Sequence, residues 1–311
     1  MLSLNKLEIF ALVVETGSFS AAAERLLLTQ PAVSQHIQDI EAMLGVQLFT
    51  RGRRGVALTP PGETLYAYSQ RILRLVLEAE SAVTDVRHIK SGQTRIGATP
   101  GVSMYLLPGW IRTFQHAYPN LTLALETAVT SKVLAGVLTH ELDIGIIEGE
   151  LDRLPTDGLT SLALRDIDMY VIVGTGHDWC QHASVPIAAL DGQPFITRTA
   201  DSQTRRWIDT LMAEHGVAPR IVAEFDNPEA IKQAVASGIG ITILPGYAVF
   251  HEQARKVVRT VELDDVNLGR TLKLVWDEHR PFSPVTKALL THLTAEFPQL
   301  APFLETTRGQ L

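Results

Sequence analysis

The sequence has 311 residues, and because folded domains average about 150 residues, two or three folded units are expected. Its 46% hydrophobic and 20% charged residues are typical of globular proteins and exclude a disordered chain. The single cysteine, Cys180, excludes a disulfide framework and a multi-cysteine metal site. The N-terminus lacks the features of a signal peptide and no apolar run reaches membrane-spanning length, so a cytoplasmic protein without a membrane partner is expected.

Charge is distributed unevenly along the sequence, whose net charge is −7. Residues 1–62 hold five basic and five acidic side chains, whereas residues 96–311 hold 17 basic and 25 acidic ones. Three of the five N-terminal basic residues fall together, namely Arg51, Arg53 and Arg54. Net charge alone therefore does not reveal a DNA-binding protein, and the acidic surplus belongs to the C-terminal part.

Three helices are predicted in the first 45 residues. Apolar residues at helical spacing predict a helix over 3–15 that Gly17 stops. Ser20 is predicted to cap a second helix over 21–26. Thr29 is predicted to cap a third helix, which opens with Gln30 and Pro31, since a proline in the first turn forfeits only an amide without a helical partner.

The outward face of the third helix has almost no charge. Its N-terminal end presents amides and small side chains, which suit the major groove because Gln pairs with base edges and Ala contacts a thymine methyl group. An ordinary solvated helix face is the alternative. The next segment favours the groove, because strands predicted over 46–49 and 56–59 enclose a basic turn over 51–55, as in a wing that contacts phosphates.

The first sixty residues closely resemble the LysR-type family of transcriptional regulators. The resemblance is carried by GSFSAAA from Gly17, TQPAVS from Thr29, LGVQLFTR from Leu44 and LTPPG from Leu58. It implies a winged helix-turn-helix over 1–62 in an α/β protein. It also implies base contacts from Gln30, Pro31, Ala32, Ser34 and Gln35, and phosphate contacts from Ser20, Thr29, Arg51, Arg53 and Arg54.

A heptad pattern follows and predicts a long helix over 63–90 that pairs with a second helix. The apolar positions are Leu65, Tyr68, Ile72, Leu75, Ala79, Ala82, Val86 and Ile89. A helix packed on its own domain is the alternative. A twofold dimer of winged domains predicts double-stranded DNA with an interrupted inverted repeat as the partner. The family resemblance implies a homotetramer, and RNA polymerase is a further candidate partner.

Strands alternate with helices from residue 95 onward, which predicts α/β sheets with helices on both faces. Strands are expected at 95–98, 121–126, 143–147, 169–173, 195–197, 220–225, 241–244 and 272–276, and helices near 102–118, 131–139, 203–215, 228–237 and 284–296. In the family this region resembles a two-lobed type 2 periplasmic binding protein. An effector-binding domain is therefore expected over 91–304, with lobe one at 91–163 and 268–304, lobe two at 164–267, and a tail at 305–311.

Ligands of open α/β sheets bind beyond the carboxyl ends of strands, where helix N-termini present free amides to an anion. Polar residues at those positions are the effector-site candidates, although a hydroxyl at a helix start is often only a cap. Arg198 would supply a positive partner for a carboxylate, phosphate or sulfate. The candidates are Thr99, Ser103, Thr130, Ser131, Glu148, Arg198, Ser202, Thr204 and Asn227.

Three segments look like the branch of regulators of carbon fixation and sulfur assimilation, namely QPFITR from Gln193, DSQTR from Asp201 and VASGIGITILP from Val235. Ala200 and Asp201 replace the commoner Pro-Gly of that branch, and the turn after Thr99 is less polar. The effector is therefore expected to be a small anionic metabolite, and the resemblance does not identify which one.

An enzyme and a stand-alone solute-binding protein are the two alternative classes for this sequence. The sequence lacks a nucleophile elbow, a dinucleotide fingerprint, a phosphate-binding loop and a zinc-protease motif, so an enzyme is not expected, and neither is a cofactor or a metal. The group of His177, Cys180 and His182 is interpreted as incidental because it falls in a predicted loop. A stand-alone solute-binding protein would explain the C-terminal part but not the first ninety residues.

Overall fold

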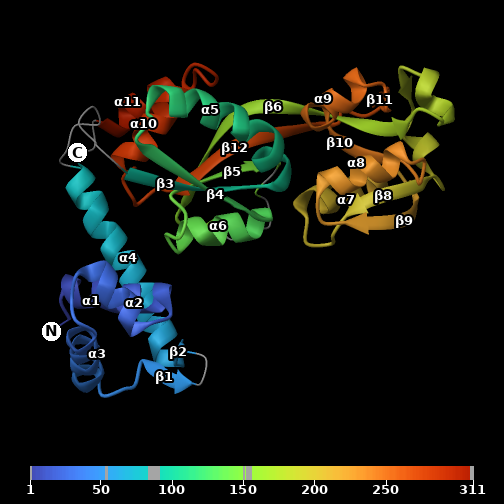
Figure 1. The fold of residues 1–311 in the computed structure, drawn as a ribbon. Coiled ribbons are helices and arrows are strands. Elements are labelled where there is room, and N and C mark those ends of the chain that lie inside the picture. Colours follow the sequence, from blue (N-terminus) through green and yellow to red (C-terminus); the bar gives the residue numbers. More distant parts are fainter. Residues whose placement is uncertain (1, 53–54, 83–91, 150, 152–155, 309–311) are drawn as a thin grey trace. The chain divides into compact units, whose positions relative to one another are not determined.

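The computed structural model describes residues 2–52, 55–82, 92–149, 151 and 156–308. The chain divides into two compact units, Met1–His88 and Ile89–Leu311. Figure 1 labels their helices and strands.

Three helices form the first unit, α1 (Leu4–Thr16), α2 (Phe19–Leu26) and α3 (Gln30–Leu44). Gly17 and Gly45 end α1 and α3 with left-handed backbone angles, and the end at Gly17 confirms the sequence prediction. Thr29 occupies the N-cap position of α3, although its side chain makes no capping bond. The predicted cap of α2 is wrong: Ser18 accepts from the Ala21 amide, and Ser20 lies inside the first turn.

A hairpin of β1 (Phe49–Gly52) and β2 (Gly55–Leu58) follows α3, with Phe49 opposite Leu58. The first strand was predicted at 46–49 and begins three residues later. The reason is Glu41, whose carboxylate accepts from the Leu48 amide at 2.7 Å, so that this amide is taken by a side chain instead of a strand partner.

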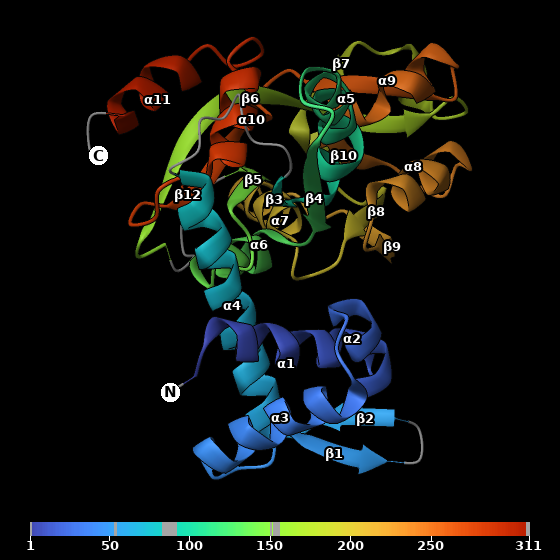
Figure 2. The same cartoon turned by 60° about the vertical axis from the view of Figure 1, so that its left-hand side comes forward.

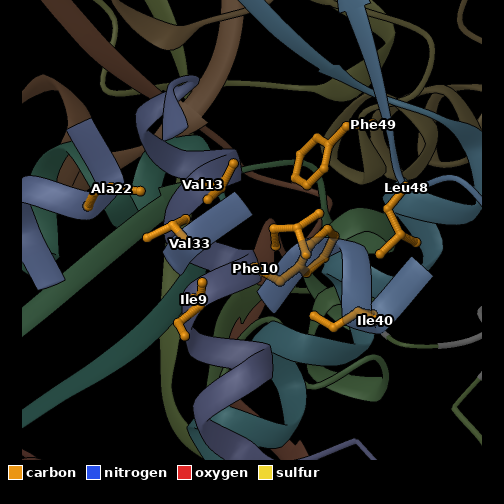
Figure 3. Packing of buried hydrophobic residues seen from close by; sticks show 10 residues of the cluster. Ile9, Phe10, Val13, Ala22, Val33, Ile40, Leu48 and Phe49 are labelled. Carbon is orange, nitrogen blue, oxygen red and sulfur yellow. The ribbon is translucent and has the colours of Figure 1, made fainter. Parts of the chain in front are cut away.

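The core of the first unit joins all of these elements (Figure 3). Phe10 of α1 lies at its centre, with its ring 5.3 Å from that of Phe49. The other fully enclosed members are Ile9, Val13, Ala22, Ala23, Val33, Ile37, Ile40 and Leu48. Burial of this apolar set fixes α3 with one face inward and the opposite face outward.

Helix α4 (Pro60–Ala82) continues from the hairpin. Its first turns pack on the same core through Leu65 and Tyr66. Beyond them the predicted apolar stripe is open to solvent, since Tyr68, Ile72 and Leu75 are 56%, 38% and 64% exposed. The last two stripe positions, Val86 and Ile89, lie outside the described residues.

The described strands of the second unit form an eight-stranded sheet, which runs through both lobes along β6 (Leu159–Gly174) and β12 (Gly269–Asp277), and a two-stranded sheet in lobe two. In lobe one, β3 (Gly92–Ala98) pairs in parallel with β4 (Leu121–Thr127) and β5 (Ile144–Glu148), and β12 runs antiparallel to β5. In lobe two, β8 (Pro194–Arg198) pairs in parallel with β9 (Arg220–Phe225) and bridges to Ile241 beside β10 (Thr242–Pro245), which is antiparallel to β6. The two lobes therefore repeat one strand order, as a two-lobed binding fold does.

Strand β6 passes from one lobe into the other and is longer than the predicted 169–173. Its residues 159–168 pair with β12, while residues 169–174 pair with β10 and with β11 (Val258–Leu263). The register with β12 shifts where Leu272 faces Arg165 and Lys273 faces Ala163, which leaves Leu164 as an extra residue. Such a bulge increases local strand twist at the crossing.

Helices cover both faces of the lobe-one sheet in Figure 1, with α6 (Thr130–Leu138) below and α5 (Leu107–Ala117) and α10 (Pro284–Leu293) above. Lobe two carries α7 (Gln203–Glu214), α8 (Pro228–Ala236) and α9 (Gly246–Ala254). Figure 2 shows α8 beside β8 and β9 from a second direction. The predicted helix near 102–118 is divided, because a π-helix, η2 (Val102–Leu106), precedes α5.

Several elements escaped prediction. They are β7 (Ser184–Val185), β11, α9, the 3-10 helices η3 (Asp178–Gln181) and η4 (Ile187–Leu190), and α11 (Leu300–Arg308), which covers part of the predicted tail. Among the described residues no helix is both long and apolar enough to cross a membrane.

Candidate nucleic-acid interface and effector cleft

The N-terminal end of α3 presents the predicted base-reading face. Gln30, Pro31 and Gln35 are exposed and Ala32 and Ser34 are partly exposed, while Val33 and Ile37 point into the core. Thr29 and Ser20 are exposed as well. Of the wing arginines, Arg51 has its backbone in β1, whereas its side chain and all of Arg53 and Arg54 lie outside what the structure describes.

Gln35 is oriented by a contact that the sequence did not suggest. Its Nε2 donates to Asp39 Oδ1 at 3.0 Å, and Lys6 Nζ of α1 lies 3.4 Å from the other oxygen of that carboxylate. The hydrogen bond from Gln35 is the main cause that lowers the pKa of Asp39, so the carboxylate is charged at neutral pH. The contact therefore occupies one amide hydrogen of Gln35 with a neighbour on the same helix.

A small pocket in the second unit, partly open to solvent, is bordered by residues of both lobes. Lobe one contributes the end of β3, the start of α6 and the end of β5, and lobe two contributes the end of β8 and the start of α7. The lining residues are Thr99, Pro100, Gly101, Val129, Thr130, Glu148, Arg198, Ser202, Gln203 and Thr204. Six of the nine effector-site candidates thus border one pocket at the carboxyl ends of strands.

The other three candidates do not line this pocket. Ser103 is hydrogen-bonded to Thr127 Oγ1 at 2.6 Å, and Ser131 is exposed in the first turn of α6. Asn227 caps α8 by accepting from the Ala230 amide at 2.9 Å. Asn227 therefore has a structural role that accounts for its position, as the helix-cap alternative anticipated.

Arg198 and Glu148 are the charged side chains of the pocket, and both are 8% exposed. Arg198 donates from Nη2 to the Asp226 carbonyl oxygen at 2.7 Å, but its Nε has no hydrogen-bond partner. Burial lowers the pKa of Arg198 and Glu148 opposes that shift. Burial raises the pKa of Glu148, against the influence of Arg270 and Arg198, because a carboxylate is costly to desolvate.

Arg270 on β12 is a part of the site that sequence reasoning missed. It donates to the Glu148 carbonyl oxygen at 3.0 Å and to Thr204 Oγ1 of lobe two at 2.8 Å, and its guanidinium lies over the Trp207 ring. A Cβ at Gly149 would overlap the guanidinium, and Gly149 has a φ of +91°. In the sequence, the one sign of this close approach of Arg270 to the backbone was Gly149 itself, directly after the strand that ends at Glu148.

A second contact joins the lobes beside the pocket. Tyr105 of η2 donates to Glu229 of α8 at 2.7 Å, and the ammonium group of Lys232 lies between Glu229 at 2.7 Å and Glu252 at 2.8 Å. Lys232 also faces the Tyr105 ring at 4.7 Å, a cation–π distance. Burial, followed by Glu229, raises the pKa of Tyr105, so this phenol keeps its proton and remains the donor.

The arrangement suits the binding of an anion. Buried donors converge on a small pocket, and among the described residues that line it no nucleophile lies beside a histidine or lysine base. Among the described residues no three His, Cys, Asp or Glu side chains are grouped to hold a metal. In the stretch around Cys180, His177 accepts from the Trp179 amide at 3.1 Å.

A winged helix-turn-helix and a separate two-lobed domain with a polar pocket define the class of ligand-responsive DNA-binding regulators. The family model "Bacterial regulatory helix-turn-helix protein, lysR family" matches residues 4–63, and the model "LysR substrate binding domain" matches residues 88–298. The chain belongs to the LysR family, which confirms the expected family and α/β fold class. It is a transcriptional regulator and not an enzyme.

Relatives agree with this assignment. A "Probable RuBisCO transcriptional regulator" of Trichormus variabilis is 30% identical over 298 residues, covering 95% of this chain and 88% of that protein. A full-length OxyR variant from Pseudomonas aeruginosa has a TM-score of 0.71 at 25% identity, covering 94% of this chain and 95% of the other. The Synechocystis CcmR regulatory domain "in complex with 2-PG" has a TM-score of 0.62 at 25% identity, covering 67% and 98%. The predicted resemblance to carbon-fixation regulators is thereby confirmed.

Proposed function

We propose that this regulator binds a small anionic metabolite in the pocket between its lobes, and that occupancy changes how its paired winged domains bind and bend DNA. The observation that carries the proposal is the pair of buried donors, Arg198 Nε and Thr99 Oγ1, that border one pocket from opposite lobes without a hydrogen-bond partner. Buried donors of this kind cost stability unless a ligand satisfies them. The ligand in the CcmR complex, 2-phosphoglycolate, is a small anion.

The DNA partner is proposed to be double-stranded and to contain an interrupted inverted repeat. Gln30, Pro31, Ala32, Ser34 and Gln35 would contact base edges. Ser20, Thr29, Arg51, Arg53 and Arg54 would contact phosphates.

Two copies of the chain are proposed to pair through α4. The exposed side chains of Tyr68, Ile72 and Leu75 form an apolar stripe that water does not favour, and a second copy of the same stripe would cover it. A homotetramer built from two such dimers follows from the family, with RNA polymerase as a candidate partner at the promoter. The regulator would act in the cytoplasm, where its DNA partner is located.

Effector binding would act by changing the angle between the lobes. The lobes touch through Arg270 with Thr204 and through Tyr105 with Glu229, so a ligand between them competes with or reinforces these contacts. A ligand shifts the equilibrium only by its difference in affinity for the two arrangements. The shift would reach DNA by altering the packing between subunits.

The test is footprinting of the purified full chain on the DNA flanking its own gene, with and without a panel of small organic and inorganic anions. Protection of an interrupted inverted repeat that changes with one anion is expected. Arg198→Met should abolish the change and keep the protection, whereas Arg206→Met, which removes an equal charge from the exposed face of α7, should keep both. A response that survives Arg198→Met would refute the proposed site.

A further inference from the structure

Glu148 is the acidic side chain among the described residues that line the pocket. Its carboxyl group is buried, and its Oε1 has no hydrogen-bond partner among the described residues. An anionic ligand alone would not satisfy this oxygen and would be repelled by it whenever Glu148 is charged. The residue therefore implies a second chemical feature of the ligand, beyond its charge.

A second orphaned polar atom approaches the same place from lobe two. The hydroxyl of Tyr247, in the first turn of α9, is buried and has no partner. A Cβ built on Gly101 would lie 2.7 Å from this hydroxyl and 3.4 and 3.5 Å from the two carboxyl oxygens of Glu148. The bare backbone of Gly101 thus adjoins both atoms, and Gly101 itself borders the pocket.

An acceptor and a phenol around one point match the hydrogen-bonding capacity of an alcohol. A hydroxyl group donates one hydrogen bond and accepts others, so it can donate to Glu148 Oε1 and accept from the Tyr247 O–H at the same time. Carboxylates and phosphates that carry only acceptors cannot do this. Donor groups for the charge lie close by, because Arg198 borders the same pocket and interacts electrostatically with Glu148.

We propose that the effector is an anion bearing a free hydroxyl group, with its charge on Arg198 and its hydroxyl between Glu148 and Tyr247. The inference rests on the proposed function, since it specifies the ligand class of that pocket. A site that hydrogen-bonds a ligand hydroxyl rejects the analogue that lacks it, because the analogue leaves buried polar groups unpaired. Glu148 and Tyr247 are then specificity-determining residues.

The experiment compares paired anions by calorimetric titration of the full chain. The pairs are 3-phosphoglycerate with 3-phosphonooxypropionate, which differs only by loss of the hydroxyl, and glycolate with acetate; 2-phosphoglycolate is added as a further anion without a hydroxyl. At least one hydroxylated member is expected to bind about tenfold or more tightly than its partner. Glu148→Met should abolish that preference, and Glu126→Met, which removes an exposed carboxylate of the same lobe, should not.

Tyr247→Phe provides a second variant that keeps the ring and removes one hydroxyl, and it should reduce the preference about threefold or more. Equal binding of both members of each pair by the wild-type protein, or a preference that survives both variants, would overturn the inference. Tight binding of anions without a hydroxyl through Arg198 would also overturn it while leaving the proposed function intact. Failure of every hydroxylated anion to bind would reject this ligand class, and footprinting with the wider panel would then decide the proposed function.

Discussion

The outer face of α3 and the pocket between the lobes are both polar, but they differ in burial. Gln30 and Gln35 are exposed, whereas Thr99, Glu148 and Arg198 are buried and each keep an atom without a partner. Water satisfies an exposed amide, so a face that reads DNA costs the folded chain little. A pocket for a small molecule must exclude water, so its polar groups cost stability until the ligand arrives. Substitutions on the outer face of α3 should therefore change DNA binding alone. Substitutions in the pocket should change both ligand binding and the stability of the fold.

The largest effect is expected on the exposed side, at α4. Leu75→Glu places a charge in the apolar stripe and should weaken the proposed dimer at least about 100-fold, because two leucines lose their burial and two carboxylates are brought together. Sedimentation over a range of concentrations measures the effect. Gln70→Glu adds the same charge on the opposite side of α4 and is the control. An unchanged dimer in Leu75→Glu would remove α4 from the interface.

Gln35→Ala should lower discrimination at one base position about tenfold, since one paired hydrogen bond to a base edge is lost. Its unfolding temperature should change little, because the side chain is exposed and its bond to Asp39 is a surface contact within one helix, worth about 0.2–0.5 kcal/mol. Arg53→Ala should instead weaken binding to specific and random DNA alike. Binding titrations on both DNAs separate these outcomes, and equal loss of affinity for both in Gln35→Ala would exclude it from base reading.

Ser18 and Ser20 lie within one turn at the start of α2, and substituting them one at a time separates an effect on stability from an effect on DNA binding. Ser18→Ala should destabilise the first unit by about 1 kcal/mol, because it removes the side chain that caps the Ala21 amide. Ser20→Ala should leave stability nearly unchanged and reduce DNA affinity through a lost phosphate contact. Chemical denaturation and DNA titration of both variants test this, and similar destabilisation by both would contradict the assignment of the cap.

The smallest effect is expected in the buried pocket and should depend on pH. Because the folded state raises the pKa of Glu148, the carboxyl group favours folding below its unfolded pKa and loses that contribution as pH rises through the folded pKa. Glu148→Gln should therefore raise the unfolding temperature of the second unit by about 1–2 °C at pH 8 and by less near pH 4. Calorimetry without effector at both pH values tests the sign; a gain that grows toward low pH would contradict it.

The sequence predicted the exposed surfaces better than the buried pocket for a physical reason. Helix ends at Gly17 and Gly45, the outward face of α3 and the stripe of α4 follow from local periodicity and capping. The shift of β1 depends on a bond between Glu41 and Leu48, and the cap of α2 depends on which of two nearby serines is extended. The start of β1 and the N-cap of α2 therefore depend on specific contacts, which the hydrophobic periodicity of the sequence does not predict.

In the second unit most strand positions were predicted within a few residues, because short apolar runs mark them. The pairing of the strands was not predicted, since β12 pairs with β5 and β6, which lie more than 100 residues earlier in the sequence. Arg270 reaches the pocket residues Glu148 and Thr204 only through that pairing, and Tyr247 lies beside Gly101 only through the unpredicted helix α9. Thr99, Thr130 and Arg198 were predicted because they follow a strand, begin a helix and end a strand, respectively, and such positions can be recognised in the sequence alone.

The continuous strand β6 has a mechanical consequence. Its 16 residues belong to both lobes, so the lobes are joined by a hydrogen-bonded ribbon with β12 instead of a slack connection. Strand ribbons are twisted, and the bulge at Leu164 is expected to increase that twist locally. Motion between the lobes should therefore be a rotation about the ribbon axis, with the elastic restoring torque of the sheet returning the lobes when the ligand leaves.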